Sequence, residues 1–411
     1  MTKWTERRTS DLIDGLRAGV SVRSISGEAG GPAVLKTSAI KAGRFDPRES
    51  KPILPADLPR AKCPVAADSI IISRMNTPAL VGDVGYVEKD FDSLFLPDRL
   101  WIARSKHGSG TDIRWLTYHF SSQAGARALR ELATGTSGSM KNIPKDKVLG
   151  LKVLTPTPPE QRAIADALTD ADKLINSLER LISKKQAIKQ GVMHELLTGR
   201  TRLPGFTAEW KESRLGSFGT FLKGRGIKRD EIQSRGVPCI RYGELYTTFE
   251  NYTEQTASFV SDDIAATALP IRYGDILFAG SGETKAEIGT NVAYLGKVQA
   301  VAGGDIIVFR GISHNPVFLS SLLNSPAIAA QKARAGQGDA IVHIHSSSLA
   351  EIVVNVPPIE EQEAIAQILQ DADKEIAALD RRLETARNIK TGMMQELLTG
   401  RTRLPVAEVS S

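Results

Sequence analysis

The stretch that decides the fold occurs twice in this chain. Residues 160–173 read EQRAIADALTDADK, and residues 361–374 read EQEAIAQILQDADK. Both copies end in the same nine residues, LLTGRTRLP, at 196–204 and at 397–405. From 156 to 204, 28 of 49 positions are identical to those 201 residues later. This period exceeds the roughly 20 to 50 residues of a solenoid repeat. We therefore interpret it as a duplicated two-part module with a pseudo-two-fold axis.

Apolar residues in both copies follow the heptad spacing of a long helix. They alternate at intervals of four and three residues, with Ala171 and Ala372 completing the pattern, at Ile164, Leu168, Ile175, Leu178 and Ile182 and at Ile365, Leu369, Ile376, Leu379 and Leu383. Such a seam predicts a helix that buries one narrow stripe against a partner. Each copy is the other's only matching partner, and helices joined through an intervening domain most naturally pack antiparallel. We therefore expect an antiparallel coiled coil.

The alternative is that the two helices each dock on their own domain. The shared seam and the identical ends favour pairing over that alternative. Thr157 and Glu160 flank two prolines in the pattern of a helix start, whereas the second copy lacks the capping hydroxyl. Gly199 and Gly400, each followed by basic residues, are typical of a helix end.

Length and composition indicate several soluble domains. A chain of 411 residues exceeds the usual limit for one hydrophobic core. Two cysteines, Cys63 and Cys239, are too few for a disulfide scaffold or a cysteine-rich metal site, which suits a reducing cytoplasm. We find neither a membrane-length apolar run nor a leader, and therefore expect a cytoplasmic location with no membrane partner. The net charge of +6 permits a polyanionic partner without requiring one.

The predicted fold class is α+β, with two mixed α/β domains that alternate with two long helices. We place the first globular domain at 1–155, the central helical region at 156–204, the second domain at 205–356 and the C-terminal helical region at 357–411. Short β-rich runs bounded by glycines occur in the same order in both domains, but their residues have diverged. Helices that stay alike indicate equivalent partners, and domains that differ indicate different targets.

No catalytic or metal site is predicted. Residues 280–285 lack the glycine–lysine spacing of a phosphate-binding loop, and 224–226 form only part of a dinucleotide fingerprint. The run from Asn315 to Phe318 partly matches the Asn-Pro-Pro-Tyr/Phe motif of adenine methyltransferases, but it lacks the second proline. His343 and His345 have no third ligand nearby, so ordinary loop histidines are predicted there.

The order of these segments resembles the specificity (S) subunit of Type I restriction–modification enzymes. The resemblance covers essentially the whole chain and depends on the twin Glu-Gln-x-Ala-Ile-Ala helices and their Leu-Leu-Thr-Gly-Arg ends. It implies that each globular domain is a target recognition domain for one half of a bipartite, asymmetric site in double-stranded DNA. It also implies that the coiled coil sets the distance between the half-sites.

The same resemblance implies the partners and the cofactors. Two methyltransferase (M) subunits dock on the helices, and restriction/translocase (R) subunits join them. S-adenosylmethionine, ATP and Mg²⁺ belong to those partners, and this chain itself is not an enzyme. The complex is then an adenine-N6 DNA methyltransferase and an ATP-dependent endonuclease. The alternatives are a coiled-coil scaffold without a DNA role and a duplicated DNA-modifying enzyme.

Polar and basic residues on loops at strand ends are the candidate DNA contacts, because a rigid scaffold can present them to a groove. From 221 to 242 six basic residues face only two acidic ones, although a solvated loop has the same composition. The candidates in the first domain are Arg17, Arg23, Lys36, Arg74, Asn76, Lys106, Ser139 and Lys141. Those in the second are Lys223, Arg225, Lys228, Arg241, Tyr242, Ser281, Thr284, Lys285, Lys332 and Arg334.

Overall fold

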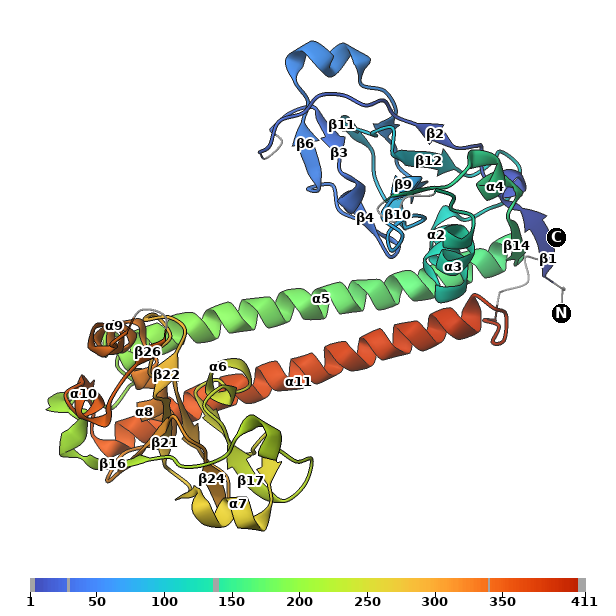
Figure 1. Cartoon of the computed structure of the whole chain (residues 1–411). Helices are drawn as coiled ribbons and strands as arrows, with labels where there is room; N and C mark the ends of the chain where they lie inside the picture. Colours follow the sequence, from blue (N-terminus) through green and yellow to red (C-terminus); the bar gives the residue numbers. More distant parts are fainter. Residues whose placement is uncertain (1–3, 28–29, 136–139, 339–340, 406–411) are drawn as a thin grey trace. The chain divides into compact units, whose positions relative to one another are not determined.

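The computed structural model describes residues 4–27, 30–135, 140–338 and 341–405 (Figure 1). The chain divides into two compact units. Unit 1 comprises Met1–Glu179 and Arg381–Ser411, and unit 2 comprises Arg180–Asp380. Each unit therefore combines one globular domain with part of both long helices. The α+β prediction is confirmed.

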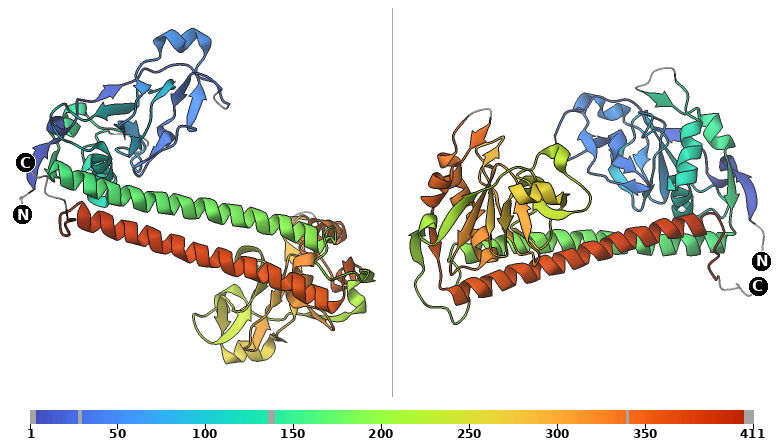
Figure 2. Two further views of the ribbon diagram at one scale, coloured as in Figure 1. Left: turned by 180° about the vertical axis from the view of Figure 1, so that it is seen from behind. Right: turned by 60° about the horizontal axis from the view of Figure 1, so that its bottom comes forward.

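The two long helices are α5 (Pro158–Leu197) and α11 (Ile359–Leu397). With 40 and 39 residues, each is about 60 Å long. In unit 1, Lys390 Nζ lies 2.7 Å from Asp172 Oδ1, and Arg387 Nη2 lies 2.7 Å from Glu179 Oε1. Residue numbers rise along α5 as they fall along α11, so the pair is antiparallel, as predicted (Figures 1 and 2).

Unit 2 has the same pairing between the remaining parts of the two helices. Lys185 Nζ lies 2.7 Å from Glu375 Oε1, and Lys189 forms an ion pair with Asp373. Lys189 and Lys390 are equivalent positions of the repeat, as are Asp172 and Asp373. The duplicated sequence thus builds the same inter-helix ion pair in each unit.

Some residues of the predicted seam pack into the domain cores, and the others lie farther along the paired helices. Nine of its ten residues are buried, and Ile376 is half-buried. In unit 1, Ile164 and Leu168 join the core of the globular domain, and in unit 2 Ile365 and Leu369 do so. The remaining seam positions lie farther along the helices. Docking on a domain, considered as an alternative to pairing, therefore occurs beside it. The N-terminal end of each helix docks through its two core residues, and the C-terminal ends dock through Leu196–Leu197 in unit 2 and Leu397–Leu398 in unit 1.

The identical ends of the repeat clamp each helix to the start of the other. In unit 2, Arg202 donates through Nε and Nη2 to the two carboxylate oxygens of Glu361, at 2.6 and 2.7 Å. Trp210 Nε1 donates to the same carboxylate, and the Arg202 guanidinium lies 5.7 Å from the Trp210 ring centroid. Gly199 has φ +67°, and a Cβ there would lie 3.4 Å from the Trp210 ring. Glycine therefore gives both the turn and the close approach.

Unit 1 repeats this clamp with the roles of the helices exchanged. Arg403 Nη1 lies 3.4 Å from Glu160 Oε1 and its guanidinium lies 5.7 Å from the Trp4 ring centroid. Trp4 Nε1 donates to Glu160, and Gly400 has φ +72° against the Trp4 ring. The identity of the two LLTGRTRLP segments is thus explained by one contact made twice.

The glutamine of the repeat ties each helix to its domain. Gln161 Nε2 donates to Pro156 O, and its Oε1 accepts from the backbone N–H of Asp112, the N-cap of α2. Gln362 Nε2 donates to Pro357 O, and its Oε1 accepts from Asn315 N, the N-cap of α8. Both glutamines are buried. The partial methyltransferase motif at Asn315 is therefore a helix cap, because the Asn315 side chain accepts from Val317 N and Phe318 N.

Unit 1 contains two four-stranded sheets, in the orders β10-β8-β12-β2 and β6-β3-β11-β7. Their strands are β2 (Arg17–Ala18), β3 (Ala33–Leu35), β6 (Ser50–Pro52), β7 (Pro64–Val65), β8 (Ser69–Ser73), β10 (Val84–Val87), β11 (Phe91–Phe95) and β12 (Leu100–Arg104). Three two-stranded ribbons are β1 (Thr5–Arg8) with β14 (Lys152–Thr155), β4 (Ile40–Lys41) with β5 (Arg44–Phe45), and β9 (Met75–Asn76) with β13 (Lys141–Asn142). The helices are α1 (Thr9–Leu12), α2 (Ile113–Ser121), α3 (Gln123–Glu131) and α4 (Lys145–Gly150).

Unit 2 contains a five-stranded sheet, β16-β25-β21-β23-β18, and a four-stranded sheet, β19-β17-β24-β20. Their strands are β16 (Gly219–Lys223), β17 (Val237–Ile240), β18 (Tyr252–Thr253), β19 (Ser258–Val260), β20 (Leu269–Ile271), β21 (Ile276–Ala279), β23 (Asn291–Tyr294), β24 (Ala300–Ala302) and β25 (Ile306–Gly311). The ribbons are β15 (Lys211–Arg214) with β27 (Val353–Val356) and β22 (Ser281–Gly282) with β26 (Val342–His343). The helices are α6 (Glu244–Thr247), α7 (Asp262–Thr267), α8 (Pro316–Leu323), α9 (Pro326–Ala335) and α10 (Ser346–Ala350).

A central strand separates two cores in each unit. Along β8, Ile70 and Ile72 face the core that α5 joins, and Ile71 faces the second core. Along β21, Ile276 and Phe278 face one core and Leu277 faces the other. Side chains alternate along a strand, so a continuous apolar run is expected where both faces of a sheet are covered. The ribbons β9–β13 and β22–β26 project from the ends of these central strands.

Replacing Gln362 with Met is expected to lower the free energy of unfolding of unit 2. Methionine retains the length but leaves Asn315 N–H and Pro357 C=O without their partner, at a combined cost of about 2 to 4 kcal/mol. Denaturant unfolding, with amide exchange of α8 as a local probe, measures the effect. Glu363→Met is the matched control, because Glu363 is exposed on the same turn. Equal effects of both substitutions would contradict the assigned role.

Candidate nucleic-acid interface

Glycines shape the basic loop of unit 2, which comprises residues 223–228 and begins at the end of β16. Gly224 N donates to Ile306 O and Gly304 N donates to Gly226 O, both at 2.8 Å. Gly226 has φ +62°, and a Cβ at Gly224 would lie 2.0 Å from Gly303 O, so neither position accepts an ordinary side chain without a shift. The loop is therefore shaped by its glycines; Ile227 packs into the core, and Arg225 and Lys228 are exposed.

The cations of this loop are free to bind an anion. Lys223, Arg225 and Lys228 are exposed, and among the described residues their charged side-chain groups form no salt bridge with a carboxylate. Lys285 and Arg334 share both properties. Unpaired exposed cations on a fixed loop are the groups that neutralise a phosphate backbone.

A pocket of about 710 Å³ adjoins this loop and contains residues that our sequence prediction missed. It is lined by Arg229 and by the predicted pair Arg241 and Tyr242. Arg241 donates to the carboxylate of the buried Glu244 at 3.0 and 3.2 Å, so that cation is already neutralised. Tyr242 is 43% exposed. Arg229 stood in the basic stretch, which was the available signal, but no spacing distinguished it from its neighbours.

Lys332 is a correction to the predicted DNA contacts. It is only 2% exposed, and its Nζ donates to Gly289 O at 2.6 Å and to Asn291 Oδ1 at 3.1 Å. Burial lowers the pKa of Lys332 to about 7. The sequence placed Lys332 among the basic residues on loops at strand ends, but it lies in α9 with its side chain in the core, so Lys332 fixes the backbone at Gly289 and is not available to DNA.

Ser281 and Thr284 are also less available than predicted. Ser281 is buried, and its carbonyl accepts from Tyr246 Oη at 2.8 Å, which ties α6 to the ribbon β22–β26. Thr284 is exposed, and its hydroxyl donates to Glu287 at 2.9 Å. The hydroxyl of Ser281 therefore faces the protein, whereas Thr284 stays on the surface near Lys285.

In unit 1, the ribbon β9–β13 brings three predicted residues together. Asn76 lies opposite Lys141 in the register, and Arg74 directly precedes β9. The Arg74 guanidinium lies 5.7 Å from the Trp101 ring centroid, and its Nε donates to Asn142 Oδ1 at 3.3 Å. Lys141 Nζ donates to Gly135 O at 2.6 Å. This cluster forms although its two strands lie far apart in the sequence.

The other predicted residues of unit 1 do not join this cluster. Three of them have carboxylate partners: Arg23 with Asp57 at 2.9 Å, Lys36 with Glu49 at 3.4 Å, and Arg17 with Asp14 at 3.5 Å. The Arg23 guanidinium holds the pKa of Asp57 below its usual value. Lys106 lies beyond the far end of β12 from Arg74 and donates to Ser10 O at 3.2 Å. Ser139 lies outside the described residues.

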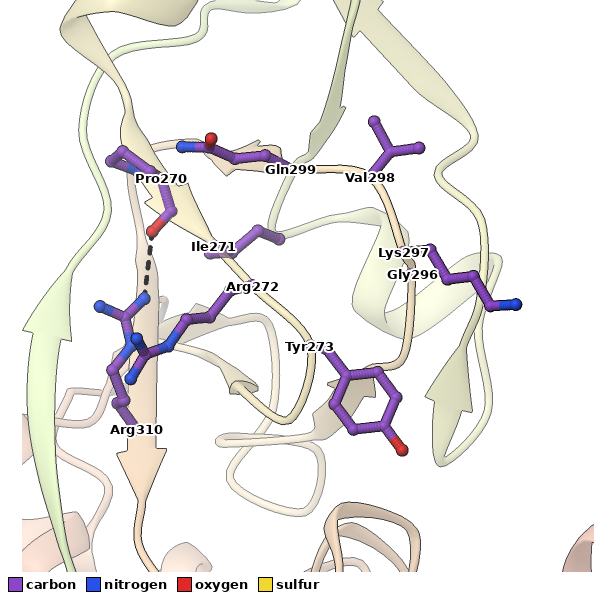
Figure 3. Close-up of a pocket in the computed structure, with 9 residues that line it drawn as sticks. All are labelled: Pro270, Ile271, Arg272, Tyr273, Gly296, Lys297, Val298, Gln299 and Arg310. Atoms are coloured by element: carbon purple, nitrogen blue, oxygen red, sulfur yellow. Dashed lines mark hydrogen bonds between the residues drawn. The ribbon is translucent and has the colours of Figure 1, made fainter.

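A second pocket of unit 2, of about 770 Å³, lies away from the basic loop (Figure 3). It adjoins the first residue of β24, whereas the basic loop contacts the last. Arg310 in this pocket donates to Pro270 O at 3.2 Å and forms two bonds with Asp275. None of the predicted contacts lines it. Size alone therefore does not identify the candidate interface.

The described residues contain no group of three or more His, Cys, Asp or Glu side chains arranged to hold a metal ion. Within the same ranges, no helix is long and apolar enough to cross a membrane.

Substituting Lys223, Arg225 and Lys228 with Ala is expected to flatten the salt dependence of DNA binding. Each cation that no longer neutralises a phosphate should reduce the slope of log K against log salt by about 0.9, because fewer counterions are released. Fluorescence anisotropy with labelled duplex at several KCl concentrations measures the slope. Arg272→Ala with Lys297→Ala is the control, because both line the pocket at the other end of β24. An unchanged slope in the triple variant would argue against these contacts.

Comparison with known proteins agrees with this architecture. The family model for the Type I restriction modification DNA specificity domain matches residues 207–386. A putative type I restriction enzyme MjaX specificity subunit of Methanocaldococcus jannaschii is 23% identical over 98% of this chain and 94% of its own length. The MjaVIII specificity subunit of the same organism is 25% identical over 63% of this chain and 64% of its own.

A solved structure shares the fold along nearly the whole chain. The S subunit of a type I restriction–modification system from M. genitalium has a TM-score of 0.59 at 18% identity. The match covers 97% of this chain and 99% of that one. The family model, the relatives and the fold agree, so the chain is similar to type I restriction–modification specificity subunits over nearly its whole length.

Proposed function

We propose that this chain is a type I specificity subunit that reads a bipartite, asymmetric DNA site, with the domain of unit 1 on one half-site and the domain of unit 2 on the other. One observation carries the proposal. The inter-helix ion pair, the arginine–glutamate clamp and the glutamine contacts recur at equivalent positions in both units, whereas the residues of the loops and ribbons differ between the two domains. A symmetric frame with unlike heads suits a DNA site whose halves differ in sequence.

Each domain is fastened to its part of the helix pair by a largely buried tyrosine. Tyr118 of α2 donates to Asp172 at 2.9 Å, and Lys390 binds the other oxygen of that carboxylate. Tyr252 of β18 donates to Asp373 at 3.0 Å, and Lys189 binds there as well. Burial raises the pKa of both tyrosines, so they remain hydrogen-bond donors at neutral pH. A domain held in this way keeps a fixed orientation on its helices.

Fixed orientation matters because bases are read in the major groove. Two domains that read bases on one face of a duplex must be about 34 Å apart, or a multiple of that distance. The helices α5 and α11 run through both units, and a paired helix is stiffer than a flexible linker. The proposal therefore includes the helix pair as the element that sets the spacing between half-sites.

Type I specificity subunits act in restriction–modification complexes and bind DNA. We extend this to two methyltransferase subunits docked on the helices and to restriction/translocase subunits that join them. S-adenosylmethionine, ATP and Mg²⁺ then belong to those partners, and this chain is a non-catalytic subunit. Adenine-N6 methylation and ATP-dependent cleavage are the activities proposed for the assembled complex.

Exchanging residues 205–356 for the equivalent segment of a related subunit is expected to change one half-site and leave the other intact. The junctions keep Arg202, Glu361 and Gln362, and the donor segment should carry a tryptophan at the position of Trp210. Sequencing the methylated adenines in a strain that expresses the chimera with its methyltransferase identifies both half-sites. A change in both half-sites would refute the assignment of one half-site to each domain.

Adding one heptad to each helix, after Lys184 in α5 and after Ala377 in α11, is expected to lengthen the spacer between half-sites. Seven residues keep the seam in register and add about 10 Å of helix, which corresponds to about three base pairs. Methylated sites would then show the same half-site bases at a longer spacing. An insertion in α5 alone breaks the register and serves as the comparison. Full activity at the original spacing would rule out the helices as the spacer.

A further inference from the structure

The two domains carry the same two-stranded ribbon, but different residues occupy the point where the ribbon joins the central strand. In unit 1, Ile143 N donates to Arg74 O, and in unit 2 Ile344 N donates to Gly280 O, both at 3.0 Å. The paired strands keep the same register, with Asn142 opposite Met75 and His343 opposite Ser281. Arg74 and Gly280 therefore occupy equivalent positions, as do Asn142 and His343.

The neighbouring sheet confirms this equivalence. In unit 1, Trp101 on β12 pairs with Ile72, two residues before Arg74. In unit 2, Ile307 on β25 pairs with Phe278, two residues before Gly280. The indole on which Arg74 rests is thus replaced by a smaller aliphatic side chain in unit 2.

Unit 1 presents a braced arginine at this position. Arg74 lies over Trp101 and donates through Nε to Asn142 Oδ1, while its Nη1 reaches Asp98 O at 3.5 Å. Nη2 makes no hydrogen bond to the described residues, and the side chain is half-buried. A guanidinium with fixed orientation and an open edge is the group that pairs with O6 and N7 of guanine.

Unit 2 presents an open pocket in the same place. Gly280 contributes no side chain, and a Cβ there would lie 3.0 Å from Asp305 O. The pocket measures about 200 Å³, and Lys223, His343 and His345 line it. All three residues are exposed, and none of their side chains forms a hydrogen bond to the described residues. The two histidines are two residues apart in extended chain, so they point to the same side.

We propose that this position determines base identity in each half-site. Arg74 reads a guanine in the half-site of unit 1, and His343 and His345 read a base edge in the half-site of unit 2, while the neighbouring Lys223 contacts the backbone phosphate. The inference rests on the proposed function and adds the specificity-determining residues. His343 and His345, which the sequence suggested to be ordinary loop histidines, become base contacts, because the glycine opposite them opens the pocket they line.

The test uses the full-length chain in complex with its methyltransferase and a duplex library randomised across both half-sites. Arg74→Lys keeps the charge but loses the planar fork. It should reduce discrimination at one base pair of one half-site by roughly 5- to 100-fold and leave the other half-site unchanged. The double variant His343→Ala, His345→Ala should relax one or two positions of the other half-site only. Sequencing of the bound fraction reports every position.

The controls separate the possible failures. His107→Ala and Lys297→Ala alter exposed residues outside both ribbons and should not change any preference. If the ribbon variants lower affinity equally for all sequences, they contact phosphates only, and the inference is overturned. A change in both half-sites at once would overturn it as well. If the wild-type complex selects no bipartite sequence at all, it is the proposed function that fails.

Discussion

A buried carboxylate at the first turn of each long helix is the constraint on which the rest depends. Glu160 and Glu361 are almost inaccessible to water, and a buried charge is tolerated only when it is paired and hydrogen-bonded. Each finds its arginine beyond the end of the opposite helix, and a tryptophan of the adjoining domain donates a further bond. These partners can meet only if the helices run antiparallel, so the charge helps to dictate the architecture.

The helical frame could be predicted from the sequence because its determinants are local and repeated. Heptad spacing, the terminal glycines and the duplicated ends are all visible within 49 residues. The role of Gln161 and Gln362 could not be predicted in the same way, because their partners are backbone groups of Asp112 and Asn315, far away in the chain. Repetition identified these residues as important, but not what they bind.

The candidate interface was harder to predict, because a sequence does not show which cations are already neutralised. Arg23 and Arg241 looked as available as Arg225, yet both have bonded carboxylates. Lys332 looked exposed, yet the fold takes it into the core. Strand pairing brought Arg74 and Lys141 together, and no local pattern indicated that β9 and β13 form a ribbon. Whether each of these residues is available to DNA depends on tertiary contacts, which the periodicity of the sequence does not reveal.

The division of the chain has a consequence for its synthesis. Unit 2 is one continuous segment, Arg180–Asp380, whereas unit 1 needs residues from both ends of the chain. Leu397 and Leu398 belong to the core that contains Trp4, and Arg403 completes the clamp on Glu160. The globular domain of unit 1 is therefore synthesised long before residues 397–403, which contribute to its core and to its clamp. Unit 2 has no such gap, because its residues form one continuous segment, so the two units meet different constraints while the chain is being made.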